Sequence, residues 1–259
     1  MQQPVPLSTT IERIRRPKLS DQVALRIEAL MVDGSFPPGS LLPPERELMQ
    51  LFGIGRPSIR EALFALNRMG LVAISSGERA RVTAPTPDRL ITELSGAARY
   101  FLTQPGAPAH FQEARALFEV GVARLAAVRR TPEELARLEQ ALRLNDAARG
   151  DAARFGRTDV GFHYALAAMT GNPIFTAVHD ALAEWLTAQR TIALRAERVE
   201  AAAFAAHERI FNAVQAGDPD GAGAAMAQHL AEIGQIIRQE TDRQQTIAAP
   251  KQADGDDRK

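Results

Sequence analysis

The chain has 259 residues and a formal net charge of zero, with 31 Lys and Arg against 31 Asp and Glu. It contains no cysteine, which excludes disulfides and a cysteine nucleophile. The sequence lacks the apolar core of a signal peptide, and no stretch approaches the ~20 apolar residues that cross a bilayer. We therefore expect a cytoplasmic protein without a membrane partner, long enough for two domains.

The charge is uneven along the chain. Residues 1–84 hold 11 Lys and Arg against 8 Asp and Glu, whereas residues 85–259 hold 20 against 23. A basic N-terminal part suits a segment that meets nucleic acid phosphates. A basic arm precedes it and either follows a DNA backbone or is a solvated tail. Its charges are Arg13, Arg15, Arg16 and Lys18.

Residues 19–70 carry the pattern of three short helices. Apolar side chains repeat at helical spacing in residues 19–32 and again in residues 45–51, where we expect Leu51 to face the core. Residues 53–55 contain two glycines and predict a tight turn before the third helix. This order of helix, turn and helix is typical of a DNA-reading motif.

Two arginines follow the turn. Arg56 and Arg60 are four residues apart and share one face of the third helix. In a helix-turn-helix the first residues of the second motif helix enter the major groove, where arginine bonds a guanine edge or a phosphate. Ser58 can add a phosphate or base contact. The alternative is an ordinary solvated helix face.

A small hairpin is predicted next. Residues 71–74 and 80–82 indicate short strands, with a turn at Gly77. Gly77 would let the backbone approach the minor groove, and Arg79 would point outward toward phosphates. The hairpin would be the wing of a winged helix-turn-helix.

The rest of the chain predicts helix. Alanine and leucine dominate, with clear stops at residues 171–173 and 217–219. We expect a mainly α protein whose second domain is a bundle of about seven helices, with one continuous helix over residues 173–196. The predicted parts are a basic arm (1–18), a winged helix-turn-helix (19–83), a linker (84–88), a helical effector-binding and dimerisation domain (89–243) and a polar tail (244–259).

The helical domain holds a candidate metal site. Asp159 and His163 share a helix face, and His207 and His229 lie on two later predicted helices. One Asp and three His can bind a divalent metal and leave positions for water or a ligand. Zn²⁺ suits this set, with Ni²⁺ or Mn²⁺ as alternatives. From spacing alone, surface or hydrogen-bonded histidines are the simpler explanation of this pattern.

Arg115 and Glu119 are also four residues apart. They predict an ordinary i,i+4 ion pair or, if the arginine faces the bundle interior, a grip for a carboxylate.

Residues 19–82 resemble the winged helix-turn-helix of the GntR family, and residues 88–240 resemble the FCD effector domain of its FadR subfamily. The resemblance implies a dimeric, ligand-responsive regulator that binds double-stranded operator DNA. It also implies that certain side chains contact the operator and that the wing tip lies at Gly77. The arginines matching the family's DNA contacts are Arg46, Arg56 and Arg60.

The same resemblance implies roles in the helical domain. Metal-binding FCD domains use one Asp and three His. These fall on Asp159, His163, His207 and His229. The family arginine matching Arg115 helps to hold an organic acid, and Asn172 belongs to a family motif that we assign to the effector site.

Several segments are similar to those of sialic-acid-responsive repressors in this family. They are residues 55–58, 77–82, 93–96, 109–111 and 171–175. This likeness implies a repressor of sialic acid uptake and breakdown genes, relieved by N-acetylneuraminate, whose carboxylate could meet the metal and Arg115. A different sugar acid, or a small hydroxy or dicarboxylic acid, is an alternative effector.

Two other functional classes fit parts of the pattern. The metal ligands could activate water in an enzyme fused to a DNA-binding domain, or the bundle could serve only for dimerisation. No additional general base stands out, so we expect a regulator and not an enzyme.

Overall fold

The computed structural model describes residues 17–193 and 199–248. Two compact units divide the chain, Met1–Leu90 and Ile91–Lys259. Most of the predicted basic arm, including Arg13, Arg15 and Arg16, lies outside the described residues, as do residues 249–259 of the predicted tail. The prediction of a mainly α protein is confirmed.

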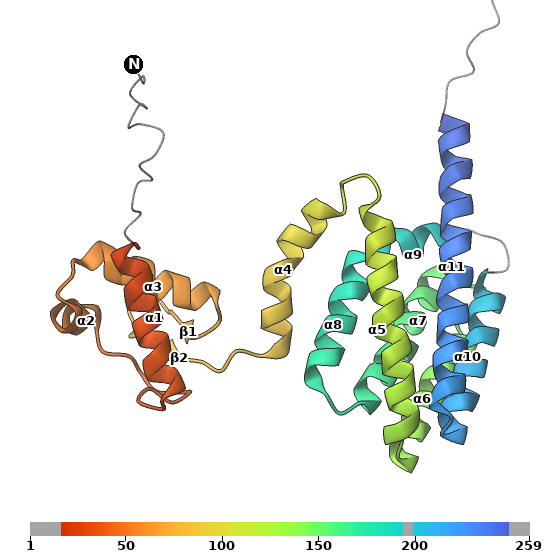
Figure 1. Ribbon diagram of the computed structural model, residues 1–259, viewed down its shortest axis with the longest axis horizontal. Helices are drawn as coiled ribbons and strands as arrows, with labels where there is room; N and C mark the ends of the chain where they lie inside the picture. The colour runs from red at the N-terminus through yellow and green to blue at the C-terminus, as the bar shows by residue number, and fades with distance from the viewer. Residues whose placement is uncertain (1–16, 194–198, 249–259) are drawn as a thin grey trace, which may run out of the picture. The chain divides into compact units, whose positions relative to one another are not determined.

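The first unit has the element order of a winged helix-turn-helix (Figure 1). Helix α1 packs on α3, and α2 packs on α3. Strands β1 and β2 pair antiparallel, with Val72 opposite Val82, and Leu41 adds an isolated bridge to Arg81. The elements are α1 (Leu19–Val32), α2 (Glu45–Phe52), α3 (Arg56–Arg68), β1 (Val72–Ala73) and β2 (Arg81–Val82).

The core of this unit corrects one expectation about α2. Leu48 is buried, and Met49 and Phe52 pack against the same core cluster. Leu51 is 66% exposed, so the prediction that it faces inward is wrong. In an α-helix, Leu48, Phe52 and Met49 fall on one arc and Leu51 falls beyond its edge, and a helix this short buries one arc only.

Glycine shapes the turn before α3. Gly53 follows α2 in the left-handed region at φ 66°, where a side chain would be strained, and its N–H bonds to the Met49 carbonyl. This ending redirects the chain within three residues. As a result α3 begins beside α2, and residues at the start of α3 can meet residues at the start of α2.

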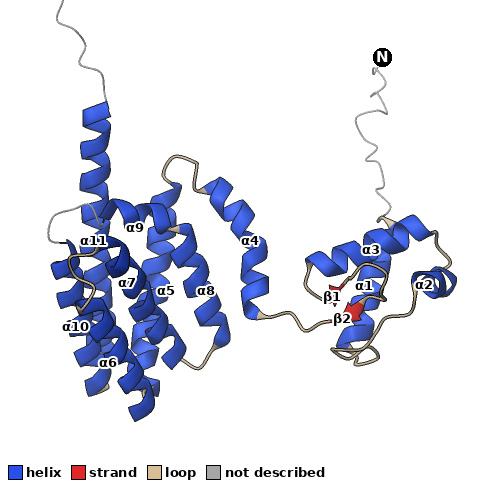
Figure 2. Ribbon diagram, turned by 180° about the vertical axis from the view of Figure 1, so that it is seen from behind, coloured by secondary structure: helices blue, strands red, loops and turns tan. Residues whose placement is uncertain are grey.

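The second unit is a helical bundle (Figures 1 and 2). Helix α11 packs along both α5 and α10, and α6 packs on α7. Its core contains Phe162, Leu166, Ile210 and Met226. The elements are α4 (Pro87–Phe101), α5 (Ala107–Arg129), α6 (Pro132–Asp146), α7 (Ala152–Met169), α8 (Pro173–Trp185), α9 (Thr187–Ala193), α10 (Val199–Ala216) and α11 (Pro219–Ala248).

The described part of the bundle therefore has eight helices where about seven are predicted. The predicted helix over residues 173–196 is interrupted at Leu186, whose φ of −94° and ψ of 14° leave the helical region. No glycine or proline marks this break in the sequence. Helix α11 also runs to Ala248, past the predicted end of the domain at residue 243. None of the described helices is long and apolar enough to span a bilayer.

Candidate functional site

A groove of about 610 Å³ runs between α3 and the wing. Five of the six predicted DNA contacts line it, and Ser58, half-buried on α3, is the exception among the described residues. The groove thus gathers basic side chains from α2, α3 and the wing on one surface. The five are Arg46, Arg56, Arg60, Gly77 and Arg79.

An acidic side chain lies among these arginines. The Glu45 carboxylate forms ion pairs with Arg56, at 3.1 Å from its Nε, and with Arg60, at 3.7 Å from its Nε. Glu45 carries no signal in the sequence, because its partners lie on another helix, across the turn.

The wing arginines contact the segment that precedes α2. Arg79 Nε donates to the Leu42 carbonyl at 2.9 Å, and Arg81 Nη1 donates to the Gly39 carbonyl at 2.7 Å. Both residues remain exposed. These bonds hold the wing against the segment that precedes α2. The guanidinium of Arg79 is therefore already oriented before any contact with a phosphate.

The four predicted metal ligands lie together in the bundle. One ligand atom from each residue lies within 4.8 Å of the others. They come from three helices: Asp159 and His163 on α7, His207 on α10 and His229 on α11. A metal with bonds of ~2.1 Å would draw these atoms slightly closer.

A hydrogen bond at Nδ1 orients the His207 ring and leaves Nε2 for a metal. Nδ1 lies 2.9 Å from Asn145 Oδ1, and the Asn145 amide nitrogen donates to Thr158 Oγ1 at 3.1 Å. With Nδ1 facing an amide oxygen, Nδ1 carries the proton and Nε2 keeps the lone pair that a metal needs. Phe162 stacks on the ring, with centroids 4.4 Å apart.

His163 lies beside a buried ion pair. Its Nδ1 is 2.5 Å from Glu119 Oε2. The other oxygen of Glu119 accepts from Arg115 Nε at 2.6 Å. The predicted i,i+4 ion pair is therefore present, and both of its residues are buried in the bundle.

Unpartnered ring nitrogens test whether a metal fits. His163 Nε2, His207 Nε2 and His229 Nδ1 are buried and have no hydrogen-bond partner among the described residues. Buried polar atoms without partners destabilise a fold. Three such lone-pair nitrogens around one carboxylate are the donor set of a divalent metal site. The residues present therefore fit a metal.

The protonation states also suit a metal. Burial lowers the pKa of His207 to about 3 and lowers the pKa of His229 well below its ordinary value. Burial alone would raise the pKa of Asp159, but His163, His207 and Arg190 outweigh it and hold that pKa below the ordinary range. At neutral pH, His207 and His229 are neutral and Asp159 is charged, as coordination requires.

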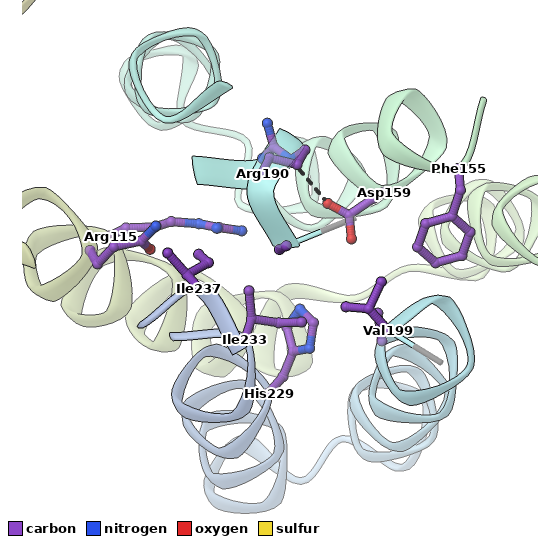
Figure 3. A pocket seen from close by; sticks show the side chains of 11 residues that line it. Arg115, Phe155, Asp159, Arg190, Val199, His229, Ile233 and Ile237 are labelled. Carbon is purple, nitrogen blue, oxygen red and sulfur yellow. Dashed lines mark ion pairs between the residues drawn. The ribbon is translucent and has the colours of Figure 1, made fainter. Parts of the chain in front are cut away.

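A small cavity of about 30 Å³ adjoins this cluster (Figure 3). Asp159 and His229 reach it from the ligand set, and Arg115 and Arg190 reach it from α5 and α9. Arg190 Nε lies 3.4 Å from Asp159 Oδ2, the pair marked in Figure 3. Apolar side chains such as Phe155 and Ile233 complete the wall.

Asn172 is not among the residues that line this cavity. Its side chain oxygen accepts the Ile174 N–H at 3.0 Å and so caps the N-terminus of α8. Asn172 thus has a structural role as a helix cap, and its assignment to the effector site stays a prediction.

Three residues of this site went unnoticed in the sequence, namely Arg190, Glu119 as a partner of His163, and Asn145. Each of them contacts a site residue that is far away along the chain, so residue spacing could not reveal the contact. Only Glu119 carried a signal, the four-residue spacing to Arg115.

Comparison with known proteins agrees with this two-part organisation. Residues 19–82 match the family model described as "Bacterial regulatory proteins, gntR family", and residues 111–232 match "FCD domain". The chain is 46% identical over 222 residues to the HTH-type transcriptional repressor NanR of Cronobacter sakazakii, covering 85% of each chain. It is 45% identical over 227 residues to NanR of Klebsiella aerogenes, covering 87% of each.

A solved structure has the same fold. The Streptococcus agalactiae GntR protein is 25% identical, with a TM-score of 0.52, covering 85% of this chain and 99% of that one. The chain therefore belongs to the GntR family of bacterial regulatory proteins, carries an FCD domain, and is a DNA-binding transcriptional regulator rather than an enzyme.

Proposed function

We propose that this protein represses genes for sialic acid uptake and breakdown and is released from, or remodelled on, its operator by N-acetylneuraminate. The single observation that carries the effector part is that four candidate metal ligands adjoin a cavity that two arginines also line. The identity of 46% to a protein named NanR supports the choice of sugar acid.

The metal would be held by Asp159, His163, His207 and His229, and Zn²⁺ suits this nitrogen-rich set best. When bound, it would supply a positive charge and an open position for an oxygen ligand.

Charge balance favours an anionic effector. Two arginines form ion pairs with two carboxylates, Arg115 with Glu119 and Arg190 with Asp159. The charges of these four side chains therefore add up to zero. The charge of a divalent metal would then be in excess, in a site largely shielded from water. A ligand carboxylate would neutralise part of it and accept hydrogen bonds from arginine.

The cavity size suggests how the effector acts. Sites for ligands of this size usually measure ~300–1,000 Å³, whereas this cavity measures about 30 Å³, which is too small for a sugar acid. The sugar acid would have to bind a more open state of the bundle. An effector acts through such a difference in affinity between two states.

We further propose that the helical domain forms a homodimer, which would set two winged domains on two operator half-sites. The winged domain over residues 19–83 would be joined to residues 89–243 by the linker at 84–88. Because a repressor acts where the chromosome is, we place the protein in the bacterial cytoplasm.

A DNA-binding titration tests the proposal. The promoter beside the protein's own gene is titrated with metal-loaded protein, with and without N-acetylneuraminate, at one fixed salt concentration because phosphate contacts depend on salt. We expect the sugar acid to weaken the complex or change its mobility. Binding that ignores the sugar would contradict the sialic acid assignment, and a screen of other sugar acids and of hydroxy and dicarboxylic acids would identify the effector.

A further inference from the structure

Glu45 is an acidic side chain on a surface that meets phosphates. It is the first residue of α2, where the helix dipole favours a negative charge. Pro44 before it adopts extended backbone with φ −61° and ψ 154°. The carboxylate is half-buried, with 35% of the side chain exposed. Glu45 is thus positioned by its own helix.

The contacts of Glu45 leave the reading edge of both arginines accessible. The ion-pair distances run to Nε, the inner nitrogen of the guanidinium, of Arg56 and of Arg60, and both arginine side chains remain 65% exposed. The two terminal nitrogens, Nη1 and Nη2, can bond O6 and N7 of guanine in an end-on fork. Glu45 can therefore hold both arginines while they read bases.

Holding an arginine changes which DNA it prefers. A mobile arginine has many rotamers and can reach any phosphate, and a phosphate contact carries no sequence information. A base-edge contact needs one orientation of the guanidinium, and ordering the side chain beforehand reduces the entropy lost on binding. The negative charge of Glu45 also repels phosphates. Only a guanine edge offers the two arginines a contact that compensates for this repulsion.

We infer that Glu45 is a positioning residue that sets operator specificity, because it orients Arg56 and Arg60 for base reading and weakens their binding to phosphates alone. This inference concerns the DNA side of the molecule and does not depend on which effector the helical domain takes.

The test uses Glu45→Gln in the full-length protein, which keeps the size of the side chain and removes its charge. Dissociation constants are measured by fluorescence anisotropy at several salt concentrations. The probes are a specific duplex selected from random sequences by the wild-type protein and a scrambled duplex of equal length. We expect tighter binding to the scrambled duplex, no gain on the specific one, and a ratio between them that falls about tenfold.

The chain supplies two matched controls, each removing one negative charge. Glu47→Gln acts on the same helix but outside the groove, and Glu78→Gln acts in the groove at the wing. We expect both controls to shift the two dissociation constants in parallel and to leave their ratio unchanged.

Two results would overturn the inference. The first is an unchanged ratio in Glu45→Gln. The second is an equal fall of the ratio in Glu47→Gln, which would make Glu45 a general charge. If Glu45→Gln does not fold by circular dichroism, Glu45→Asp decides, because it keeps the charge but shortens the reach. We expect Glu45→Asp to lower the ratio without tightening binding to the scrambled duplex, and an unchanged ratio there refutes the inference.

Discussion

Asp159 faces Arg190 with one carboxylate oxygen and His207 with the other. Oδ2 lies 3.4 Å from Arg190 Nε, and Oδ1 lies 3.5 Å from His207 Nε2. One carboxylate therefore joins the candidate metal cluster to a cationic side chain of the cavity. A substitution at Arg190 would change the surroundings of the Asp159 carboxylate without removing a candidate metal ligand.

Arg190→Met is the first prediction that follows. The variant keeps the side chain length and removes the charge, so we expect metal content to stay close to wild type while affinity for N-acetylneuraminate falls about ten- to a hundredfold, the worth of a charged hydrogen bond. Calorimetric titration of the metal-loaded protein measures this. Arg157→Met, an exposed arginine of α7 outside the cavity, is the control. Loss of metal together with affinity would show that Arg190 acts structurally.

Arg56→Ala tests the recognition helix. A bidentate arginine–guanine contact discriminates by ~1–3 kcal/mol, so we expect weaker operator binding and a broader choice of sequence at one operator position. Gel-shift titrations against operators mutated one base pair at a time measure both effects. Arg68→Ala, exposed at the end of α3 and outside the groove, should match wild type. If Arg56→Ala kept the affinity and the sequence preference of the wild type, Arg56 would not be a contact of the operator.

His207→Ala tests the metal cluster. We expect purified variant protein to carry much less divalent metal by plasma mass spectrometry, and operator binding to lose its response to the sugar acid. DNA binding by the metal-free variant should match that of metal-free wild type, because the change lies in the other unit. His110→Ala, an exposed histidine, is the matched control. A variant that stays fully loaded and responsive would count against the site.

Acid should destabilise the metal-free protein. His207 has a pKa of about 3 in the fold against 6.5 ordinarily, so between these values the unfolded chain binds a proton that the folded chain does not. The free energy of unfolding therefore falls as pH drops from about 6.5 toward 3, by up to about 4 kcal/mol from this group. Burial also lowers the pKa of His229, and this shift lowers the free energy of unfolding in acid in the same way.

Urea unfolding between pH 7.5 and pH 5 measures this slope on chelator-treated protein. His207→Gln cannot titrate there, so its midpoint should depend less on pH, while His110→Gln should follow wild type. An unaltered slope in His207→Gln would mean that the ring is charged in the fold or already neutral in the unfolded chain.

Local signals made the first unit predictable. The ends of α3 and the wing turn at Gly77 are set by neighbouring residues, and the structure has them where the sequence predicts. The exposure of Leu51 was not predictable, because an apolar residue at the edge of a helical stripe fits either side. The ion pairs of Glu45 depend on how two helices meet, which spacing does not encode.

The bundle was predictable in class but not in detail. Only Asp159 and His163 share a helix, so assembling four ligands from residues up to 70 positions apart needed a family resemblance. The break at Leu186 carries no breaker residue, and it begins the short helix that bears Arg190. A prediction of one continuous helix there could not place this arginine at the cavity.

The unpartnered imidazole nitrogens bear on how long the protein survives in a cell. A metal that binds only the folded state shifts the folding equilibrium in proportion to its free concentration. Because proteases degrade chains that open, the fraction of unfolded repressor sets its turnover. With the metal scarce, the protein would be cleared faster, and the genes that we propose it represses would be expressed even where no sugar acid is present.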